Sequence, residues 1–355
     1  MALFRQEEKS AAEGIPIDRG SMSRWLEHAG NTIGATIIAA ARAEAMKSAL
    51  CLATDATGIA IQPIRTHEKV RQACRPGHFF VQIADRDHVF FEYTPRETSK
   101  AVYEMFRGFS GYVQADAKSV YDLLFREPRS DDDVEPDGAS REELGCWAHL
   151  RRKFYDAAAI TKDPIAREGL YRIHRVFENE ERFRKIAPAQ RKQLRDRESR
   201  PHVDAFFEWV KIELAKVIDQ RGLLRTALNY ASRHEAAFKR FLDDGRLQID
   251  NNRSERELRR VAVGRKNWLF VGSDDHAEAT AALLSMVASA RMHGLDPEAY
   301  LRDVFRVLPH WPSDRHIELA AKYWTGTRAR LDADELATEI GPLTIPPPEQ
   351  QTPAS

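Results

Sequence analysis

Two aspartates stand where carboxylates could share a metal ion. Asp55 follows the apolar run at 49–54, and Asp116 follows the short run at 111–115. Ligands of open α/β sheets bind at the carboxyl ends of the strands, so adjacent strands would bring both carboxylates to one point. Two Mg²⁺ ions about 4 Å apart, held by oxygen ligands, catalyse phosphoryl transfer. The alternative is structural, because Asp also ends strands as a turn or capping residue.

A third acid, Glu255, follows the sequence Asp250-Asn251-Asn252. Either Asp250 or Asn251 can cap a helix that carries Glu255 in its first turns. Five cations follow it closely: Arg256, Arg259, Arg260, Arg265 and Lys266. A glutamate among cations suits a metal site that also holds phosphate backbones. A solvated basic helix with one compensating acid is the alternative.

A second basic cluster lies in the segment 146–154, which reads CWAHLRRKF. Its cations are Arg151, Arg152 and Lys153, and these side chains would face either DNA or water. Trp147 is a candidate core residue because of its size. A lone histidine such as His149 is more often structural than catalytic, so its role stays open.

The bulk composition limits the class of protein. The chain has 355 residues, 43% of them hydrophobic, and a formal net charge of +0, so a basic DNA-binding surface must be local. The three cysteines have no zinc-ligand spacing and fit a reducing cytoplasm. No apolar run reaches the roughly 18–20 residues that span a bilayer. We expect no membrane association.

The hydrophobic pattern predicts an α/β fold with a mixed sheet. Apolar, β-rich runs predict strands at 49–54, 59–63, 78–84, 88–94, 111–115 and 144–147, with a turn at 85–87. Helical spacing without a strand signal extends from His149 to about Leu242. Ser21 is the predicted cap of an early helix, and Asp296-Pro297 starts a late one.

These patterns divide the chain into six predicted segments. They are a helical segment at 1–47, the first part of the core at 48–148, a helical insertion at 149–243, the second part of the core with the Glu255 helix at 244–294, a C-terminal helical segment at 295–340, and a disordered Pro-rich tail at 341–355.

Three motifs, in order, resemble those of the IS66 family of insertion-sequence transposases. Cys146–Phe154 is similar to the family's CWAHxRRKF hallmark. Residues 250–256 and 264–273 are similar to its DNN..ER and GRKNWLF.GS block, and Leu295–Leu301 to its C-terminal motif. The family's DET and DGY motifs correspond to Asp55-Ala56-Thr57 and Asp116-Ala117-Lys118, where only each aspartate matches.

The resemblance implies a DDE transposase with an RNase H-like core and a large helical insertion. Asp55, Asp116 and Glu255 would be catalytic and would bind two Mg²⁺ (or Mn²⁺) ions. The implied partner is double-stranded DNA, both element ends and target, with possible self-association in a synaptic complex. The expected DNA-binding residues are Arg151, Arg152, Lys153, Arg256, Arg259, Arg265 and Lys266. The expected location is the cytoplasm, in association with the nucleoid.

Two other functions stay open. Family members usually carry an N-terminal DNA-binding region and a cysteine zinc motif, and we expect this chain to have only the end of that region, at 1–47. A truncated or decayed remnant that binds DNA or a partner transposase without cutting is therefore one alternative. A stand-alone nuclease of the RNase H type, acting on hybrids, shares the acids but not the motifs.

Overall fold

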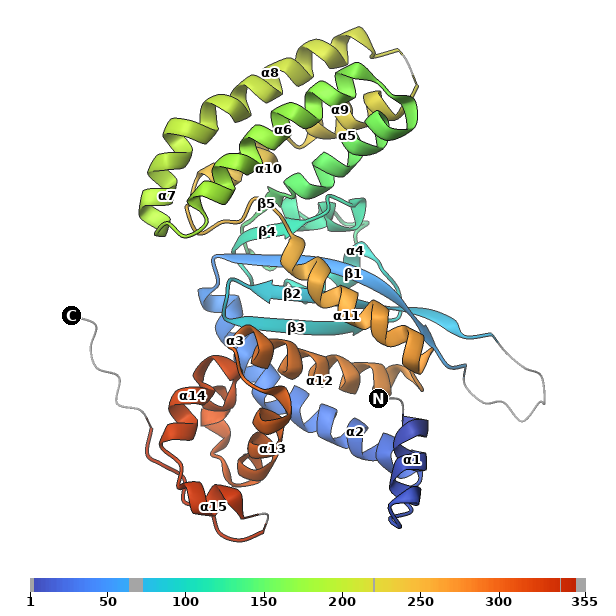
Figure 1. Cartoon of the computed structure of the whole chain (residues 1–355), viewed down its shortest axis with the longest axis vertical. Coiled ribbons are helices and arrows are strands. Elements are labelled where there is room, and N and C mark those ends of the chain that lie inside the picture. Colours follow the sequence, from blue (N-terminus) through green and yellow to red (C-terminus); the bar gives the residue numbers. More distant parts are fainter. Residues whose placement is uncertain (1–2, 64–72, 220, 339, 349–355) are drawn as a thin grey trace. The chain divides into compact units, whose positions relative to one another are not determined.

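The computed structural model describes residues 3–63, 73–219, 221–338 and 340–348 (Figure 1). The chain forms two compact units. The first comprises Met1–Leu50, Asp55–Ala101 and Arg256–Ser355, and the second comprises Cys51–Thr54 and Val102–Glu255. Strand β1 and helix α11 each begin in the second unit and continue into the first, so both units contain part of the predicted core.

The strands form the mixed sheet that the sequence predicted, in the order β3-β2-β1-β4-β5. Strand β2 pairs with β3 antiparallel, whereas β1 with β4 and β4 with β5 are parallel pairs. The strands are β1 (Cys51–Ile61), β2 (Arg75–Ala84), β3 (His88–Thr94), β4 (Gly111–Ala115) and β5 (Arg141–Gly145).

The hairpin of the first unit confirms the predicted pair of strands at 78–84 and 88–94. Its register runs from His78 opposite Thr94 to Ala84 opposite His88. Asp85 occupies the turn with a φ of 51°. Helix α12 (Asp274–Met292) packs on β3, where the Ser285 hydroxyl accepts a hydrogen bond from the Phe91 N–H at 2.7 Å. Small residues along α12 permit this close approach.

Helices make up the rest of the first unit. They are α1 (Leu3–Ala12), α2 (Arg19–Ile33), a π-helical turn at Gly34–Ile38, α3 (Ala39–Ser48), α13 (Pro297–Val307), α14 (Ala321–Ala329) and α15 (Ala333–Ala337), with α4 (Ser99–Met105) at the boundary and α11 (Asn252–Trp268) shared. Asp296 caps α13 as predicted, accepting from the Ala299 N–H. No described helix is long and apolar enough to cross a membrane. Of the predicted tail, 349–355 lies outside the described residues.

The second unit contains the predicted all-helical block. Its helices are α5 (Trp147–Thr161), α6 (Pro164–Phe183), α7 (Pro188–Leu194), α8 (Arg200–Lys216), α9 (Leu223–Arg233) and α10 (Glu235–Lys239) (Figure 1). Trp147 is fully buried and contacts the rings of four phenylalanines: Phe206, Phe207, Phe238 and Phe241. Its indole N–H donates to the Phe238 carbonyl at 2.9 Å. One tryptophan therefore fixes α5 against α8 and the chain around α10.

Three predicted boundaries were wrong. Asp18, not Ser21, caps α2, because its carboxylate accepts from the Ser21 N–H and hydroxyl. The predicted strand 144–147 ends at Gly145, and Trp147 begins α5. The predicted strands 49–54 and 59–63 are one strand, β1. The strand continues because Val271 pairs with its far end, exchanging hydrogen bonds with Ala60 and Gln62.

We predict that Trp147→Ala lowers the free energy of unfolding by about 3–5 kcal/mol, since it removes a fully buried aromatic side chain and leaves a cavity. Urea denaturation measures this change. Trp25→Ala is the matched control: that side chain is 60% exposed, so its loss should cost less than about 0.5 kcal/mol. An equal decrease in the free energy of unfolding of the two variants would show that Trp147 has no special part in the packing of the helices.

Candidate active site

The strands that carry Asp55 and Asp116 are parallel neighbours, as predicted. Cys51, Leu52 and Ala53 of β1 pair with Tyr112, Val113 and Gln114 of β4. Asp55 lies two residues after Ala53, and Asp116 lies two residues after Gln114. Asp55 is not at the end of its strand, contrary to the prediction. It lies instead just beyond the stretch of β1 that pairs with β4, since β4 ends at Ala115.

Asp116 is a shielded carboxylate in a tight turn. Its side chain is 13% exposed, and the Lys118 ammonium lies 3.5 Å from Oδ2. The following residue, Ala117, has a φ of 54°. This left-handed conformation favours glycine, which explains the glycine of the DGY motif that Asp116-Ala117-Lys118 resembles. The Tyr230 hydroxyl donates to the Asp116 carbonyl at 3.3 Å. Burial raises the pKa of Tyr230, so it stays a proton donor.

The residues before α11 form an anchor segment, Gln248–Asn251, that joins elements of the second unit. The Gln114 side-chain amide of β4 donates to the Gln248 carbonyl at 2.9 Å. The Trp147 N–H, at the start of α5, donates to the Ile249 carbonyl at 3.0 Å. The anchor segment therefore connects the strand that precedes Asp116 with the helix that carries the second basic cluster.

Asn251 makes the connection to β1. Its side-chain amide donates to the Thr54 carbonyl at 2.6 Å, and its N–H donates to the Cys146 thiol at 3.3 Å. Asn251 is only 1% exposed. Thr54 directly precedes Asp55, and Asn251 lies one helical turn before Glu255. The hydrogen bond thus ties together the chain positions next to two predicted catalytic acids.

Cys146 is an inert structural thiol. Burial raises its pKa to about 11, so it remains protonated and unreactive at neutral pH. Cys146 is a free cysteine at the N-cap position of α5, and its side chain makes no capping hydrogen bond.

The carboxylate of Asp250, rather than the side chain of Asn251, bonds the first residue of α11, Asn252. This carboxylate accepts hydrogen bonds from the Asn252 N–H at 3.1 Å and from the Asn252 side-chain amide at 2.7 Å. The Asn251 side chain is therefore free to bind β1 instead. Asp250 thus bonds the start of α11, whereas the adjacent Asn251 bonds strand β1.

Glu255 lies in the first turn of α11 and pairs with His149 of α5. The His149 Nε2 atom is 3.6 Å from Glu255 Oε1, and the two side chains are 24% and 32% exposed. His149 Nδ1 is buried and has no hydrogen-bond partner among the described residues. The sequence did not predict this pair, because α5 and α11 begin more than 100 residues apart.

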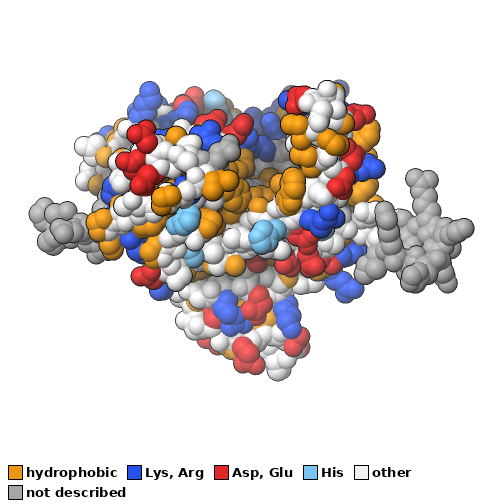
Figure 2. Space-filling model, turned by 90° about the horizontal axis from the view of Figure 1, so that it is seen from below, with side chains coloured by type: hydrophobic (Ala, Val, Ile, Leu, Met, Phe, Trp, Pro, Cys, Tyr) orange, Lys and Arg blue, Asp and Glu red, His pale blue; other side chains and the backbone are white. Residues whose placement is uncertain are grey.

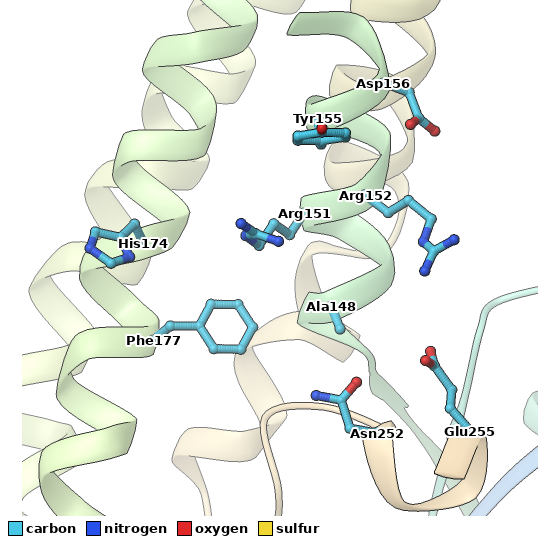
Figure 3. Close-up of a pocket in the computed structure, with 9 residues that line it drawn as sticks. All are labelled: Ala148, Arg151, Arg152, Tyr155, Asp156, His174, Phe177, Asn252 and Glu255. Atoms are coloured by element: carbon cyan, nitrogen blue, oxygen red, sulfur yellow. The ribbon is translucent and has the colours of Figure 1, made fainter. Parts of the chain in front are cut away.

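Glu255 also lines a pocket of about 600 Å³ in the second unit (Figure 3). Its other lining residues are Ala148, Arg151, Arg152, Tyr155, Asp156, His174, Phe177 and Asn252. Two residues of the second basic cluster, Arg151 and Arg152, thus share a pocket with a predicted catalytic acid. Lys153 points elsewhere: its ammonium lies 4.5 Å from the centre of the Tyr230 ring.

The basic helix α11 has a buried and an exposed face. Ser254, Leu258 and Val261 are buried at helical spacing. Four of the cations that follow Glu255 are exposed: Arg256, Arg259, Arg260 and Lys266. Arg260 pairs with Glu257 at 3.4 Å, and the half-buried Arg265 donates to the Gly58 carbonyl. Arg265 therefore has a structural contact, and its contact with DNA stays a prediction.

The oxygen ligands of Asp55, Asp116 and Glu255 are of the kind that Mg²⁺ or Mn²⁺ prefers. Mg²⁺ keeps several waters and needs only one or two carboxylates from the protein, so these residues suit it chemically. Within the described part of the chain, no three His, Cys, Asp or Glu side chains form a group that could hold a metal ion. The convergence of the three carboxylates stays a prediction.

Comparison with known proteins identifies the family. The model of the transposase IS66 family matches residues 1–279, and that of the IS66 C-terminal element matches residues 285–320. The chain belongs to the IS66 transposase family. Residues 250–252, which overlap the anchor segment, and the start of α5 resemble its DNN and CWAH motifs, and hydrogen bonds join the two segments in the fold. The motif at 295–301 falls within the C-terminal element, as the sequence predicted.

The curated relatives come from Sinorhizobium fredii (strain NBRC 101917 / NGR234). The uncharacterized protein y4qI is 27% identical over 88% of this chain and 58% of its own length. The uncharacterized protein y4hP is 34% identical over 50% of this chain and 34% of its own length. The chain therefore spans about half the length, or less, of these relatives. No solved structure matches it.

We predict that Asn251→Ala destabilises the protein by about 1–3 kcal/mol, because the buried Thr54 carbonyl loses its hydrogen bond. The free energy of unfolding in urea measures this. Asn267→Ala is the control, since Asn267 is exposed on the same helix. If Asn251→Ala unfolds at the same urea concentration as the control, the hydrogen bond from Asn251 to Thr54 does not contribute to the stability of the protein.

Proposed function

We propose that this IS66-family chain is a DDE transposase that cleaves and joins DNA strands, with Asp55, Asp116 and Glu255 as its catalytic acids. The observation that carries the proposal is the hydrogen bond from Asn251 to Thr54. It is buried and short, and it connects the strand of Asp55 to the residue that leads into the Glu255 helix. A purely structural role for Glu255 would not require this connection.

An RNase H-like core is part of the proposal. Its support is the sheet, in which an antiparallel hairpin lies on one side of β1 and two parallel strands on the other. In this order the two Asp-bearing strands are adjacent. The helical block after β5 is then an insertion between the last core strand and the Glu255 helix.

The three acids would bind two Mg²⁺ (or Mn²⁺) ions. Bound metal would activate the attacking oxygen and stabilise charge on the leaving oxygen. Lys118 now neutralises Asp116, and His149 lies beside Glu255. We infer that the Lys118 ammonium limits repulsion among the acids before metal binds, since like charges close together destabilise a site.

Double-stranded DNA is the proposed substrate, as element ends and as target. The net charge is +0, so the basic residues must act locally. Arg256, Arg259 and Lys266 are exposed on α11, and no ion pair or hydrogen bond from their side chains occurs within the described residues. Such cations can pair with phosphates at little cost, because no internal carboxylate must be displaced. Self-association in a synaptic complex, and action at the nucleoid in the cytoplasm, complete the proposal.

A second candidate is a family member that binds DNA without cutting it. Two observations favour it: the described residues contain no preformed group of three metal ligands, and Lys118 pairs with Asp116. Titration with Mn²⁺ separates the two proposals. A catalytic protein binds the ion through Asp55 and Asp116, whereas a non-cutting one binds none.

We predict that Asp55→Asn and Asp116→Asn each lower the rate of strand cleavage by at least about 100-fold, because an amide does not supply the charge that holds and orients the reacting groups. Nicking of a supercoiled plasmid carrying the element measures the rate. DNA binding should persist, and Asp131→Asn, in an exposed loop, should cut normally. Cleavage at the wild-type rate by either variant would show that its aspartate is not catalytic.

We also predict that the double variant Arg259→Ala/Lys266→Ala binds all DNA sequences more weakly. Its plot of log affinity against log salt should flatten by roughly one unit per lost phosphate contact, because fewer counterions are released. The control is Lys185→Ala/Arg225→Ala, which removes the same charge from other exposed positions. If the two double variants change the slope equally, α11 has no special part in holding DNA.

A further inference from the structure

The pocket beside Glu255 has the size and the surfaces of a ligand site. Its volume is about 600 Å³, which falls within the roughly 300–1,000 Å³ that is common for small-molecule sites. All of its lining residues belong to the second unit and come from α5, α6 and the start of α11. Figure 3 shows these side chains around one opening between α5 and α6.

The two arginines of the pocket have no ion-pair partner among the described residues. Arg151 and Arg152 are exposed, and within the described residues their side chains make no ion pair or hydrogen bond. Many other arginines of this unit pair with acids, as Arg195 does with Glu180 at 2.6 Å. Unpaired guanidinium groups favour a phosphate, which they can bind in a bidentate manner.

Aromatic side chains stand on both sides of the same opening. Tyr155 of α5 is 55% exposed, although a tyrosine ring is largely apolar. Phe177 of α6 is half-buried, and its ring points from α6 toward α5 (Figure 3). Exposed rings beside free arginines are typical of single-stranded nucleic-acid sites, where bases stack on the rings and cations follow the backbone.

A polar edge completes the pocket. Asn252 and Glu255 line its end at the start of α11. The Asn252 side-chain amide already donates to Asp250, which leaves its carbonyl oxygen as an acceptor for a base. Glu255 is also one of the three proposed catalytic acids, so a ligand in this pocket lies next to the proposed site of cleavage.

We propose that this pocket binds one unpaired nucleotide of the DNA strand that is being cut or joined. The base would stack on Tyr155 or Phe177, and its phosphate would bind Arg151 and Arg152. A paired base is stacked inside a duplex and presents no free ring face, so the pocket selects frayed or single-stranded ends. This inference rests on the proposed function, because it places the nucleotide beside Glu255.

The test compares three labelled DNA hairpins: blunt, with a three-nucleotide 3′ overhang, and with the same overhang lacking bases. Binding is measured by fluorescence anisotropy in EDTA, so that no cleavage is needed. The wild-type protein should bind the overhang roughly 5- to 150-fold more tightly than the other two hairpins, the range that stacking of one base supplies. Free dAMP at the same concentration should not displace the overhang.

Substitutions assign the preference to the pocket. Tyr155→Ala and Phe177→Ala should lower or remove the preference for the overhang, whereas Tyr155→Phe should keep it. Tyr171→Ala is the matched control: Tyr171 is also on α6 and is 59% exposed, but it does not line the pocket. Tyr155 is exposed, so its variants should fold as the wild type does, and circular dichroism checks this.

Several outcomes would overturn the proposal. Equal binding of the three hairpins would show that no base enters the pocket, and equal effects of Tyr171→Ala and Tyr155→Ala would place the base elsewhere. Displacement by dAMP would show a site for free nucleotides. The Asp116→Asn variant separates this inference from the catalytic one, since it should lose cleavage and keep the preference for the overhang.

Discussion

One buried amide, that of Asn251, determines how the rest of the proposed active site is assembled. It holds the Thr54 carbonyl of β1, while the neighbouring carbonyls of the anchor segment are held by β4 and by the start of α5. A buried polar network of this kind is costly when any member is left unpaired. The start of the Glu255 helix therefore has one well-defined position relative to the paired ends of β1 and β4.

The aromatic core supports that position. The Trp147 ring contacts four phenylalanine rings, and its indole N–H donates to the Phe238 carbonyl. The backbone N–H of Trp147 donates to the Ile249 carbonyl of the anchor segment. The helix that begins at Trp147 then presents His149, Arg151 and Arg152 on the side of Glu255. The helical block is thus part of the proposed site, since its packing places the residues that surround Glu255, one of the proposed catalytic acids.

The sequence predicted the mixed sheet, the hairpin, the helical block and the adjacency of the two Asp-bearing strands, because these depend on local hydrophobic pattern and chain order. It could not predict contacts between distant segments. The continuation of β1 depends on Val271, and the partner of His149 lies on another helix. The different hydrogen bonds of Asp250 and Asn251 could not be predicted either. Either side chain can bond the start of a helix, and only the fold decides that Asp250 bonds Asn252 whereas Asn251 bonds Thr54.

Metal-directed cleavage of the protein backbone tests the central claim, that Asp55, Asp116 and Glu255 hold one metal site. Fe²⁺ replaces Mg²⁺ at oxygen-ligand sites, and with ascorbate and peroxide it generates radicals that cut the nearby chain. The account predicts cuts close to residues 55, 116 and 255, all suppressed together by excess Mg²⁺ and all lost in Asp116→Asn. Cuts that miss one of the three positions, or that persist in Asp116→Asn, would contradict it.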